Sequence, residues 1–471
     1  MLDLAGVPLP TDAAALGRVH LVGIGGVGMS GIARILLARG VLVSGSDARE
    51  SGTVAALRAL GATVHIGHAA GNVGSADTVV VSTAVRPDNP ELVAARRRGA
   101  TVLPRAAALA AVMAGRRGVA VAGTHGKSTT TSMLAVAARA AGVDPSYAIG
   151  GDLDEPGSNA HHGTGPLFVA EADESDGSFL LLSPYAAIVT NVEADHLDQH
   201  GTAEAVTEIF RRFVTRVPPD GLLVLCADDP GAAGLAGHAT CRVRTYGEAA
   251  GADLRLAGVE VGPAATTYTA VLDGVPLDAV QIAVTGRHMA LNSAAALLAG
   301  VELGLPVERV VAGLAGFRGV RRRFELRGQA GGVRVYDDYA HHPTEIAAQL
   351  TAARVVAGTG RLVVAFQPHL YSRTAAFAAE FGQALGLADE VVVLEVYGAR
   401  EDPVPGVTGA TVAAGVPLPA GRVRFEPEWS AVAAELAGRA RPGDLVVTMG
   451  AGDVTMIGPE VLALLADRPG G

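Results

Sequence analysis

The residues best suited to chemistry lie in a glycine-containing stretch, VAVAGTHGKSTTT, which runs from Val119 to Thr131. An apolar run, a loop and the start of a helix follow one another in it. Backbone N–H groups of such a loop can surround an anion, and the helix N-terminus adds partial positive charge. The Lys127 ammonium could reach the outer phosphates of a nucleotide, and the Ser128 hydroxyl could ligate Mg²⁺. We therefore expect this loop to bind ATP or GTP.

The loop is shorter than the usual phosphate-binding loop, because Val121 stands where the strict pattern has its first glycine. On the motif alone, a glycine turn with an exposed lysine is the alternative interpretation. If a nucleotide binds, we expect its contacts along the loop and the first helical turn, at Gly123, Thr124, His125, Gly126, Lys127, Ser128 and Thr129.

A second glycine pattern lies near the N-terminus, in RVHLVGIGGVGMSGIARILLARG from Arg18 to Gly40. Gly23, Gly25 and Gly28 form a GxGxxG pattern between an apolar strand and an amphipathic helix, and the next apolar strand ends on Asp47. This arrangement is typical of units that bind a dinucleotide or another pyrophosphate ligand, with the acidic residue near a ribose. An NAD-binding oxidoreductase or regulator is one hypothesis, and a plain glycine turn is another.

Two glycine loops in one chain favour an enzyme with two phosphorylated ligands, because a dehydrogenase has no use for the second loop. Phosphoryl transfer from ATP requires Mg²⁺, which takes oxygen ligands. Two acidic motifs, EADESD and NVEADHLD, each follow an apolar run. Exposed acidic turns and an ordinary histidine are the alternatives. The expected metal ligands are Ser128, Glu171, Glu174 and His196.

Composition bounds the class of protein. Of 471 residues, 49% are hydrophobic and only 4% aromatic, and 61 are glycine, which predicts several α/β domains with tight turns. Acidic residues outnumber basic ones by 47 to 37, so nucleic acid is not an expected partner. The N-terminus lacks a signal-like pattern and no apolar run has membrane-spanning length, so we expect a soluble cytoplasmic protein. Cys226 and Cys241 are expected as buried, reduced thiols.

The elements that position these loops alternate between apolar runs and helical patterns. In the first part the runs recur at VLVSGSD, VHIGH and DTVVVSTAV, and after FRGVRRRFE the pattern restarts with four further runs. The segment from Ala249 to Asp278 alternates small, polar and β-branched residues, which predicts antiparallel strands. We expect three α/β domains, at residues 1–115, 116–318 and 319–471.

A set of motifs occurs in one order over nearly the whole chain: GIGGVGMSGIA, GTHGKSTTT, EADESD, NVEADHLD, GVRRRFE, DDYAHHPTE, FQPHLYSRT and MGAGD. In this set the chain resembles the Mur ligases. The resemblance implies an N-terminal Rossmann-like domain that binds a UDP-sugar. It also implies a central phosphate-loop domain that binds ATP, with a mostly parallel sheet and a small antiparallel part. The C-terminal Rossmann-like domain would serve amino-acid binding and closure.

The resemblance also implies a reaction of peptidoglycan precursor synthesis with ATP and Mg²⁺. ATP phosphorylates the lactyl carboxylate of UDP-N-acetylmuramate, and the amine of L-alanine attacks the acyl phosphate to form an amide. A carboxylate needs such activation because its oxygen is otherwise a poor leaving group. A ligase that attaches a murein tripeptide to the same sugar is the nearest alternative.

The resemblance assigns residues to these steps. The catalytic residues would be Lys127, Glu171, His196, Arg323 and Asp338, and further nucleotide contacts would come from Asn292 and Arg323. The first glycine loop would hold UDP rather than NAD, through Gly23, Gly25, Gly26, Val27, Gly28 and Asp47. The substrate carboxylate and the amino acid would be recognised by Tyr339, His341, His369 and Arg373.

Two positions depart from the family pattern. Relatives usually carry Asn directly after the histidine of a GxHN motif, whereas Met289 follows His288 here. Some relatives have Arg where Leu370 stands. The adenine contact at the first position and the anion contact at the second are therefore left open.

Overall fold

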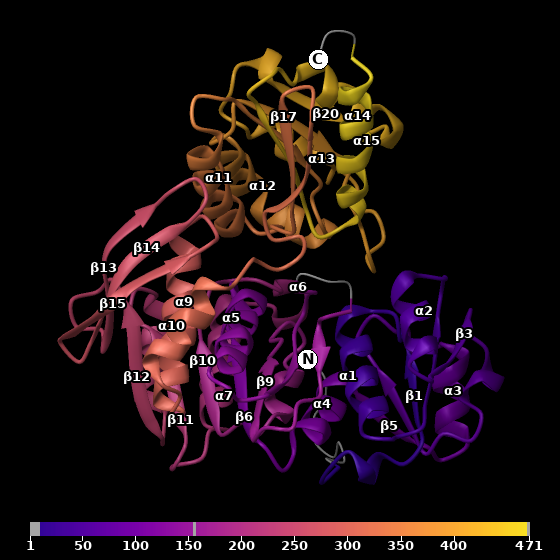
Figure 1. Ribbon diagram of the computed structural model, residues 1–471. Coiled ribbons are helices and arrows are strands. Elements are labelled where there is room, and N and C mark those ends of the chain that lie inside the picture. Colours follow the sequence, from indigo (N-terminus) through magenta and orange to yellow (C-terminus); the bar gives the residue numbers. More distant parts are fainter. Residues whose placement is uncertain (1–9, 154–156, 469–471) are drawn as a thin grey trace. The chain divides into compact units, whose positions relative to one another are not determined.

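The computed structural model describes residues 10–153 and 157–468 of the chain. Within this part the strands form three sheets, which follow one another along the sequence from indigo to yellow in Figure 1. The chain folds into two compact units. The first holds the described residues up to 257 together with 269–280 and 291–317, and the second holds 258–268, 281–290 and the described residues from 318 onward.

The first sheet carries the N-terminal glycine loop. Its strand order is β3-β2-β1-β4-β5, and all of its pairings are parallel. The chain runs outward from β1 to β3 and returns to the other side at β4, which creates a switch point of the kind where open α/β sheets bind ligands. The strands are β1 (Val19–Val22), β2 (Val43–Asp47), β3 (Thr63–Ile66), β4 (Thr78–Val81) and β5 (Thr101–Pro104). The helices are α1 (Val27–Ala38), α2 (Gly52–Ala59), α3 (Pro90–Arg97) and α4 (Arg105–Met113), with short 3₁₀ turns at Ala14–Leu16 and Ala70–Val73.

The second sheet carries the phosphate loop, and its strand order is β15-β14-β13-β12-β11-β10-β6-β9-β7-β8. Strand β6 lies between β10 and β9 and is parallel to both. Because parallel neighbours end at the same edge, the segments that follow these three strands meet there. The strands are β6 (Arg117–Ala122), β7 (Ser146–Ala148), β8 (Ala160–His161), β9 (Leu167–Glu171), β10 (Ala186–Val189), β11 (Leu222–Cys226), β12 (Arg242–Gly247), β13 (Leu254–Val261), β14 (Thr266–Leu272) and β15 (Val275–Ile282). The helices are α5 (Lys127–Ala140), α6 (Leu197–His200), α7 (Ala203–Val214), α8 (Pro230–Ala233), α9 (Arg287–Glu302) and α10 (Val307–Ala315), with 3₁₀ turns at Ser178–Leu181 and Gly234–His238.

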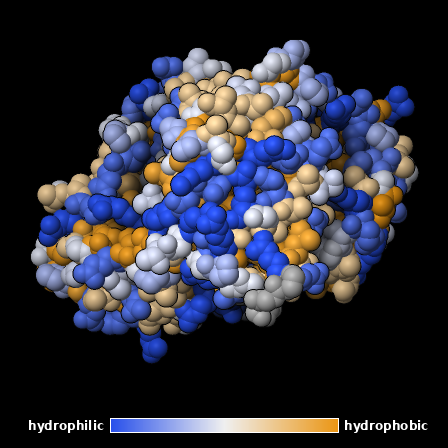
Figure 2. Space-filling model, turned by 90° about the horizontal axis from the view of Figure 1, so that it is seen from above, coloured by the Kyte–Doolittle hydropathy of each residue, from blue (hydrophilic) through white to orange (hydrophobic). Residues whose placement is uncertain are grey.

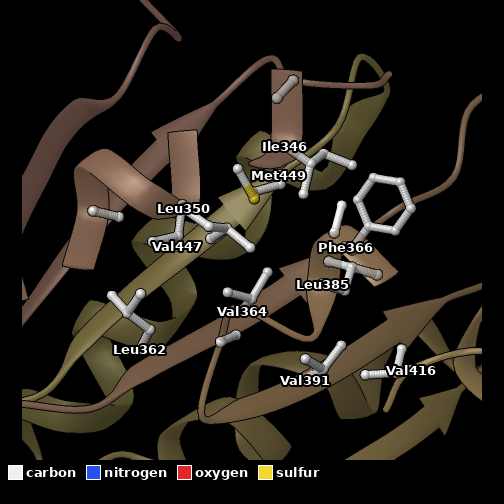
Figure 3. Packing of buried hydrophobic residues seen from close by; sticks show 14 of the residues in the cluster. Ile346, Leu350, Leu362, Val364, Phe366, Leu385, Val391, Val416, Val447 and Met449 are labelled. Atoms are coloured by element: carbon white, nitrogen blue, oxygen red, sulfur yellow. The ribbon is translucent and has the colours of Figure 1, made fainter. Parts of the chain in front are cut away.

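The third sheet has the order β16-β17-β21-β18-β19-β20, and only its β16–β17 pairing is antiparallel among those described. Figure 3 shows the packing of one face, where Ile346 and Leu350 lie beside Met449 and Val447. Burying such a side chain contributes about 1.5–3 kcal/mol. The strands are β16 (Glu325–Ala330), β17 (Val333–Asp338), β18 (Leu362–Phe366), β19 (Glu390–Leu394), β20 (Val423–Glu426) and β21 (Leu445–Met449). The helices are α11 (Pro343–Ala357), α12 (Tyr371–Leu385), α13 (Gly409–Ala414), α14 (Trp429–Arg439) and α15 (Ile457–Ala466), with 3₁₀ turns at Ala420–Arg422 and Asp453–Met456.

The predicted α/β fold with three sheet-based parts is confirmed. The apolar runs expected in the first and third parts are β1 to β4 and β17, β18, β19 and β21. One expectation is wrong: Cys226 is buried, but Cys241 is partly exposed, because it precedes β12 rather than lying inside a strand. Both cysteines are free thiols.

The described helices include none that is long and apolar enough to cross a membrane. On the face drawn in Figure 2, hydrophobic side chains form small groups separated by hydrophilic ones. Scattered apolar groups of this kind are normal for a protein surface.

Candidate active site

The first glycine loop joins β1 to α1 at the switch point of the first sheet. Gly23 has a φ of +75°, a conformation that favours glycine, and its N–H donates to the Ser46 carbonyl at 2.8 Å. Gly26 is extended and caps the 12-residue helix α1, which starts at Val27. The amino end of this helix therefore lies at the carboxyl edge of the sheet, where it would stabilise an anion.

Asp47, at the end of β2, is held against this loop. Its Oδ2 accepts the N–H of Gly25 at 2.9 Å, and a Cβ added to Gly25 would lie only 2.8 Å from the same oxygen. Glycine is thus needed at position 25 for the close approach of the carboxylate. Asp47 fixes the shape of the loop, while its contact with a ribose stays a prediction, as do the ligand contacts of Gly23, Gly25, Gly26, Val27 and Gly28.

The second glycine loop joins β6 to α5. Gly123 has a φ of +130° and Gly126 a φ of +80°, so both adopt backbone conformations that side chains strain. A Cβ at Gly123 would collide with the Thr190 hydroxyl, and one at Gly126 would lie 2.5 Å from Oδ1 of Asn292. Both glycines are therefore required by their neighbours as well as by their torsions. Asn292, predicted to contact the nucleotide, lies directly against this loop.

Two residues that sequence reasoning missed hold the loop from the end of β10. Thr190 Oγ1 donates to the His125 carbonyl at 2.5 Å, and Asn191 Oδ1 accepts the His125 N–H at 2.7 Å. The Thr124 N–H donates to the Asn191 carbonyl at 3.0 Å. The signal that could have revealed them is their place directly after a buried strand, the position that the sequence analysis used for acidic residues alone.

Lys127 begins α5, and its side chain turns back over the loop. Nζ donates to the carbonyls of Gly123 at 2.7 Å and Thr124 at 3.0 Å, and lies 2.9 Å from Oε2 of Glu174. Glu174 is only 1% exposed. Burial raises the pKa of Glu174 to about 7, and the Lys127 ammonium opposes this rise. The pair is a buried charge contact at the place where nucleotide phosphates would bind.

The other predicted metal ligands lie at the same sheet edge. His196 adopts a φ of +53°, uncommon for a residue with a side chain, and its Nε2 lies 3.7 Å from Oε1 of Glu174. Glu171 points to another neighbour, since its Oε2 accepts the Gly150 N–H at 2.6 Å. Ser128 is buried in the first turn of α5. The structure thus brings Glu174 and His196 together, and the ligation by all four residues stays a prediction.

This donor set fits Mg²⁺ through its oxygens. The Ser128 hydroxyl and the carboxylates of Glu171 and Glu174 are hard ligands, which Mg²⁺ prefers, whereas an imidazole suits softer metals better. The buried Glu174 carboxylate, whose pKa is raised by burial, is a group that an added cation would stabilise in its charged form.

Asp338 and Arg323 lie in the second unit. Asp338 ends β17 and its two oxygens accept N–H groups on either side, from Phe324 at 2.7 Å and from Ala340 at 2.7 Å. Burial raises the pKa of Asp338 to about 7, against the effect of Arg323. Arg322 and Phe324 have φ values of +59° and +53°, so Asp338 holds a strained turn.

The predicted substrate-binding residues of the second unit form one group. The Arg323 guanidinium lies 5.1 Å from the ring centre of Tyr339, whose ring lies 5.3 Å from that of His341. The ring of His341 lies 6.1 Å from that of His369, and Nδ1 of His369 lies 3.4 Å from an Arg373 nitrogen. Residues separated by some fifty positions in the chain therefore form a continuous row of aromatic and cationic groups.

Met289 and Leu370, the two residues that depart from the family pattern, are both buried. Leu370 is 2% exposed and has a φ of +70° at the start of α12, so the chain turns sharply between His369 and Tyr371. Met289 is 5% exposed on α9. Next to it, burial lowers the pKa of His288 to about 4, so this imidazole is neutral at physiological pH.

Comparisons with known proteins cover nearly the whole chain. Residues 18–117 match the Mur ligase family catalytic domain, 121–300 the Mur ligase middle domain, and 322–452 the Mur ligase glutamate ligase domain. The predicted domain limits at 115 and 318 stay predictions.

Relatives and solved structures agree with these matches. The chain is 64% identical to UDP-N-acetylmuramate–L-alanine ligase of Saccharopolyspora erythraea, covering 97% of this chain and 95% of that one. The protein of the same name from Mycobacterium tuberculosis is 56% identical, covering 98% and 96%. The crystal structure of UDP-N-acetylmuramate-alanine ligase from Thermotoga maritima matches with a TM-score of 0.79 and 30% identity, covering 95% and 98%. These likenesses support the ligase interpretation over the NAD-binding alternative, and the chain belongs to the Mur ligase family of ATP-dependent, amide-forming ligases.

Proposed function

We propose that this protein joins L-alanine to the lactyl carboxylate of UDP-N-acetylmuramate, using ATP, with Mg²⁺ as the metal cofactor. The observation that carries the proposal is the full-length likeness to relatives of that name, at 64% identity over 97% of the chain. The two glycine loops support it, since the reaction needs a nucleotide-sugar and ATP, and each loop suits one of these anions.

The chemistry is the activation of a carboxyl group. A carboxylate oxygen of the sugar attacks the γ-phosphorus of ATP, a new P–O bond forms, and ADP leaves. The amine nitrogen of L-alanine then attacks the carbonyl carbon of the acyl phosphate. The C–N bond forms, the C–O bond to phosphate breaks, and the nitrogen loses a proton. The products are the amide, ADP and phosphate.

In this proposal the second loop binds ATP. The N–H groups of residues 126–129, at the start of α5, would face the phosphates, since those of Thr124 and His125 already donate to Asn191. The Lys127 ammonium would turn from Glu174 toward the oxygens of the transferred phosphoryl group. Ser128, Glu171 and Glu174 would hold Mg²⁺, with His196 as the remaining predicted ligand, and the bound ion would offset phosphate charge. Asn292 lies against Gly126 and would contact the nucleotide.

The residues of the second unit would receive the carboxylates. Arg373 and Arg323 are suited to fork-like contacts with carboxylate or phosphate oxygens. Tyr339, His341 and His369 lie between them in the row described above. Asp338 would act by holding the turn that carries Arg323.

The test is acceptor dependence. Purified protein should release phosphate from ATP only when UDP-N-acetylmuramate and L-alanine are both present, and mass spectrometry should detect the alanyl product. L-alanine should give a higher kcat/KM than the murein tripeptide. Phosphate release that is indifferent to the amino acid, or a preference for the tripeptide, would contradict the proposal.

A further inference from the structure

Arg105 lies beside the first glycine loop, although its own segment of the chain carries none of the motifs. It is the first residue of α4, which follows β5 and packs against α1 (Figure 1). A Cβ added to Gly28 would lie 2.8 Å from Nη1 of Arg105 and 3.0 Å from its Cδ. The guanidinium therefore crosses the first turn of α1, where the N–H groups of a phosphate cradle are found.

Position 28 requires glycine because Arg105 leaves no room for a side chain there. Its backbone is helical and its φ is not positive, so its torsions place no demand for glycine. In the usual dinucleotide-binding pattern the third glycine allows a helix and a strand to pack closely. Here the space that a side chain would fill is taken by the Arg105 guanidinium, so this GxGxxG pattern makes room for a cation.

The partner of Arg105 links the two loops. Nη2 of Arg105 donates to Oδ2 of Asp173 at 2.8 Å, and the side chain of Arg105 stays 24% exposed. Asp173 belongs to the EADESD motif after β9. Burial raises the pKa of Asp173, but the charges of Arg105, Lys127 and His196 outweigh burial and hold it below its usual range. This carboxylate thus interacts with Arg105 beside the first loop and with Lys127 of the second.

A guanidinium has five N–H donors, so the contact with Asp173 leaves Arg105 able to bind a second anion. Its planar fork matches two oxygens of a phosphate group. The first turn of α1 contains no acidic residue that would compete for it.

We propose that Arg105 binds the diphosphate of the nucleotide-sugar in the first loop, and that Asp173 positions its guanidinium from the motif of the second loop. This rests on the proposed function for the identity of the sugar, but the diphosphate contact itself requires only a uridine diphosphate ligand.

The experiment measures UDP binding to the full-length protein by calorimetry, without ATP or amino acid, and then the KM for UDP-N-acetylmuramate. Arg105→Gln should weaken UDP binding and raise this KM by about 10- to 100-fold, the range for one hydrogen bond to a charged group. The affinity of Arg105→Lys for UDP should lie between those of the wild type and Arg105→Gln, because an ammonium keeps the charge but lacks the planar fork of donors. The KM for ATP should change by less than about threefold, since Lys127 is retained.

Arg18→Gln is the matched control. Arg18 pairs with Asp77 at 2.9 Å, but it precedes β1 and therefore lies at the opposite end of the same sheet. It should leave UDP binding within about twofold of the wild type. Equal effects of Arg18→Gln and Arg105→Gln, or wild-type UDP binding by a folded Arg105→Gln protein, would overturn the inference.

A double-mutant cycle separates Arg105 from the glycine loop itself. Gly28→Ala should weaken UDP binding in the wild type by displacing the guanidinium, and should add little in the Arg105→Gln background. An undiminished effect in that background would contradict the role given to Gly28. If the wild type binds UDP in an Arg105-dependent manner but forms no alanyl product, the proposed function fails and this inference stands.

Discussion

Two buried glutamates in the first unit have pKa values that are shifted in opposite directions. Glu91 is fully buried among donors: its oxygens lie 2.5 Å from Ser46 Oγ, 2.6 Å from Asn72 Nδ2 and 3.5 Å from His20 Nε2. Burial raises the pKa of Glu91, but the hydrogen bonds from His20, Ser46 and Asn72 outweigh it and hold the value at about 2. Glu174 is equally buried, yet its pKa is about 7.

The difference lies in the partners. Glu91 accepts hydrogen bonds from neutral donors and from histidine within its own domain, so these contacts stabilise its charged form. Glu174 depends on the Lys127 ammonium, a partner that a nucleotide would draw away, and it lies beside His196 and Asp173. A carboxylate whose charge is stabilised by hydrogen bonds within the fold is structural. A carboxylate whose charged form is destabilised by burial is suited to exchange its protein partner for a ligand.

The largest expected effect is at Lys127. Lys127→Met should lower kcat/KM for phosphate release by at least about 100- to 1000-fold, because it removes the cation that we propose stabilises the transferred phosphoryl group. Lys127 is also the only lysine in the sequence. An amine-reactive reagent should therefore label one side chain, and ATP should protect it; labelling that ATP leaves unchanged would contradict its place in the site.

Glu174→Gln should lower kcat/KM by about 100-fold, because a carboxylate proposed to bind the metal is lost. It should also lower the free energy of unfolding at pH 8, because the buried Lys127 ammonium loses its charged partner. A folded Glu174→Gln enzyme with wild-type kcat would show that this carboxylate, too, is structural.

Glu91→Gln should lower the stability without lowering kcat. The amide cannot accept every hydrogen bond that the carboxylate accepts, so the free energy of unfolding should fall by about 1–3 kcal/mol, as measured by urea unfolding. The kcat of the remaining folded enzyme should stay within about twofold of the wild type. A selective loss of kcat without loss of stability would break the comparison.

The contributions of the two glutamates to the free energy of unfolding should change in different pH ranges. Between pH 2 and 4.5 the unfolded chain binds the Glu91 proton and the folded one does not, so the stability from Glu91 is lost as the pH falls through this window. Between pH 4.5 and 7 the folded chain keeps the Glu174 proton that the unfolded chain has released. Stability from Glu174 is therefore lost as the pH rises, by up to about 1.4 kcal/mol per pH unit.

Urea unfolding of the ligand-free protein as a function of pH measures these slopes. Relative to the wild type, Glu91→Gln should flatten the acid window alone and Glu174→Gln the window from pH 4.5 to 7 alone. Flattening of the same window by both variants would refute the opposite pKa shifts.

The smallest effect is expected at Ser128. Ser128→Thr keeps the hydroxyl and adds one methyl group, so kcat/KM should change by less than about threefold, whereas Ser128→Ala removes the oxygen and should cost more. Equal activities of the Thr and Ala variants would exclude the hydroxyl as a metal ligand.

The sequence was most informative where one short segment sets its own geometry. Glycines of fixed spacing between a strand and a helix located both loops, because the turn conformations and the helix starts are local properties. The acidic motifs were found for a related reason, since each follows a buried strand at the carboxyl edge of a parallel sheet.

Contacts between distant segments could not be read in this way. Thr190 and Asn191 hold the phosphate loop from a strand some seventy residues later, and Arg105 reaches Gly28 only because α4 packs on α1. The Glu91 network likewise joins four segments. Each depends on strand order, which a pattern of apolar runs does not specify.

The most direct test of the ligase chemistry follows the oxygen atoms. With ¹⁸O in the lactyl carboxylate of UDP-N-acetylmuramate, one labelled oxygen should appear in the released phosphate, because the amine breaks the C–O bond of an acyl phosphate. Phosphate that carries no label while the alanyl product accumulates would contradict carboxyl activation by ATP.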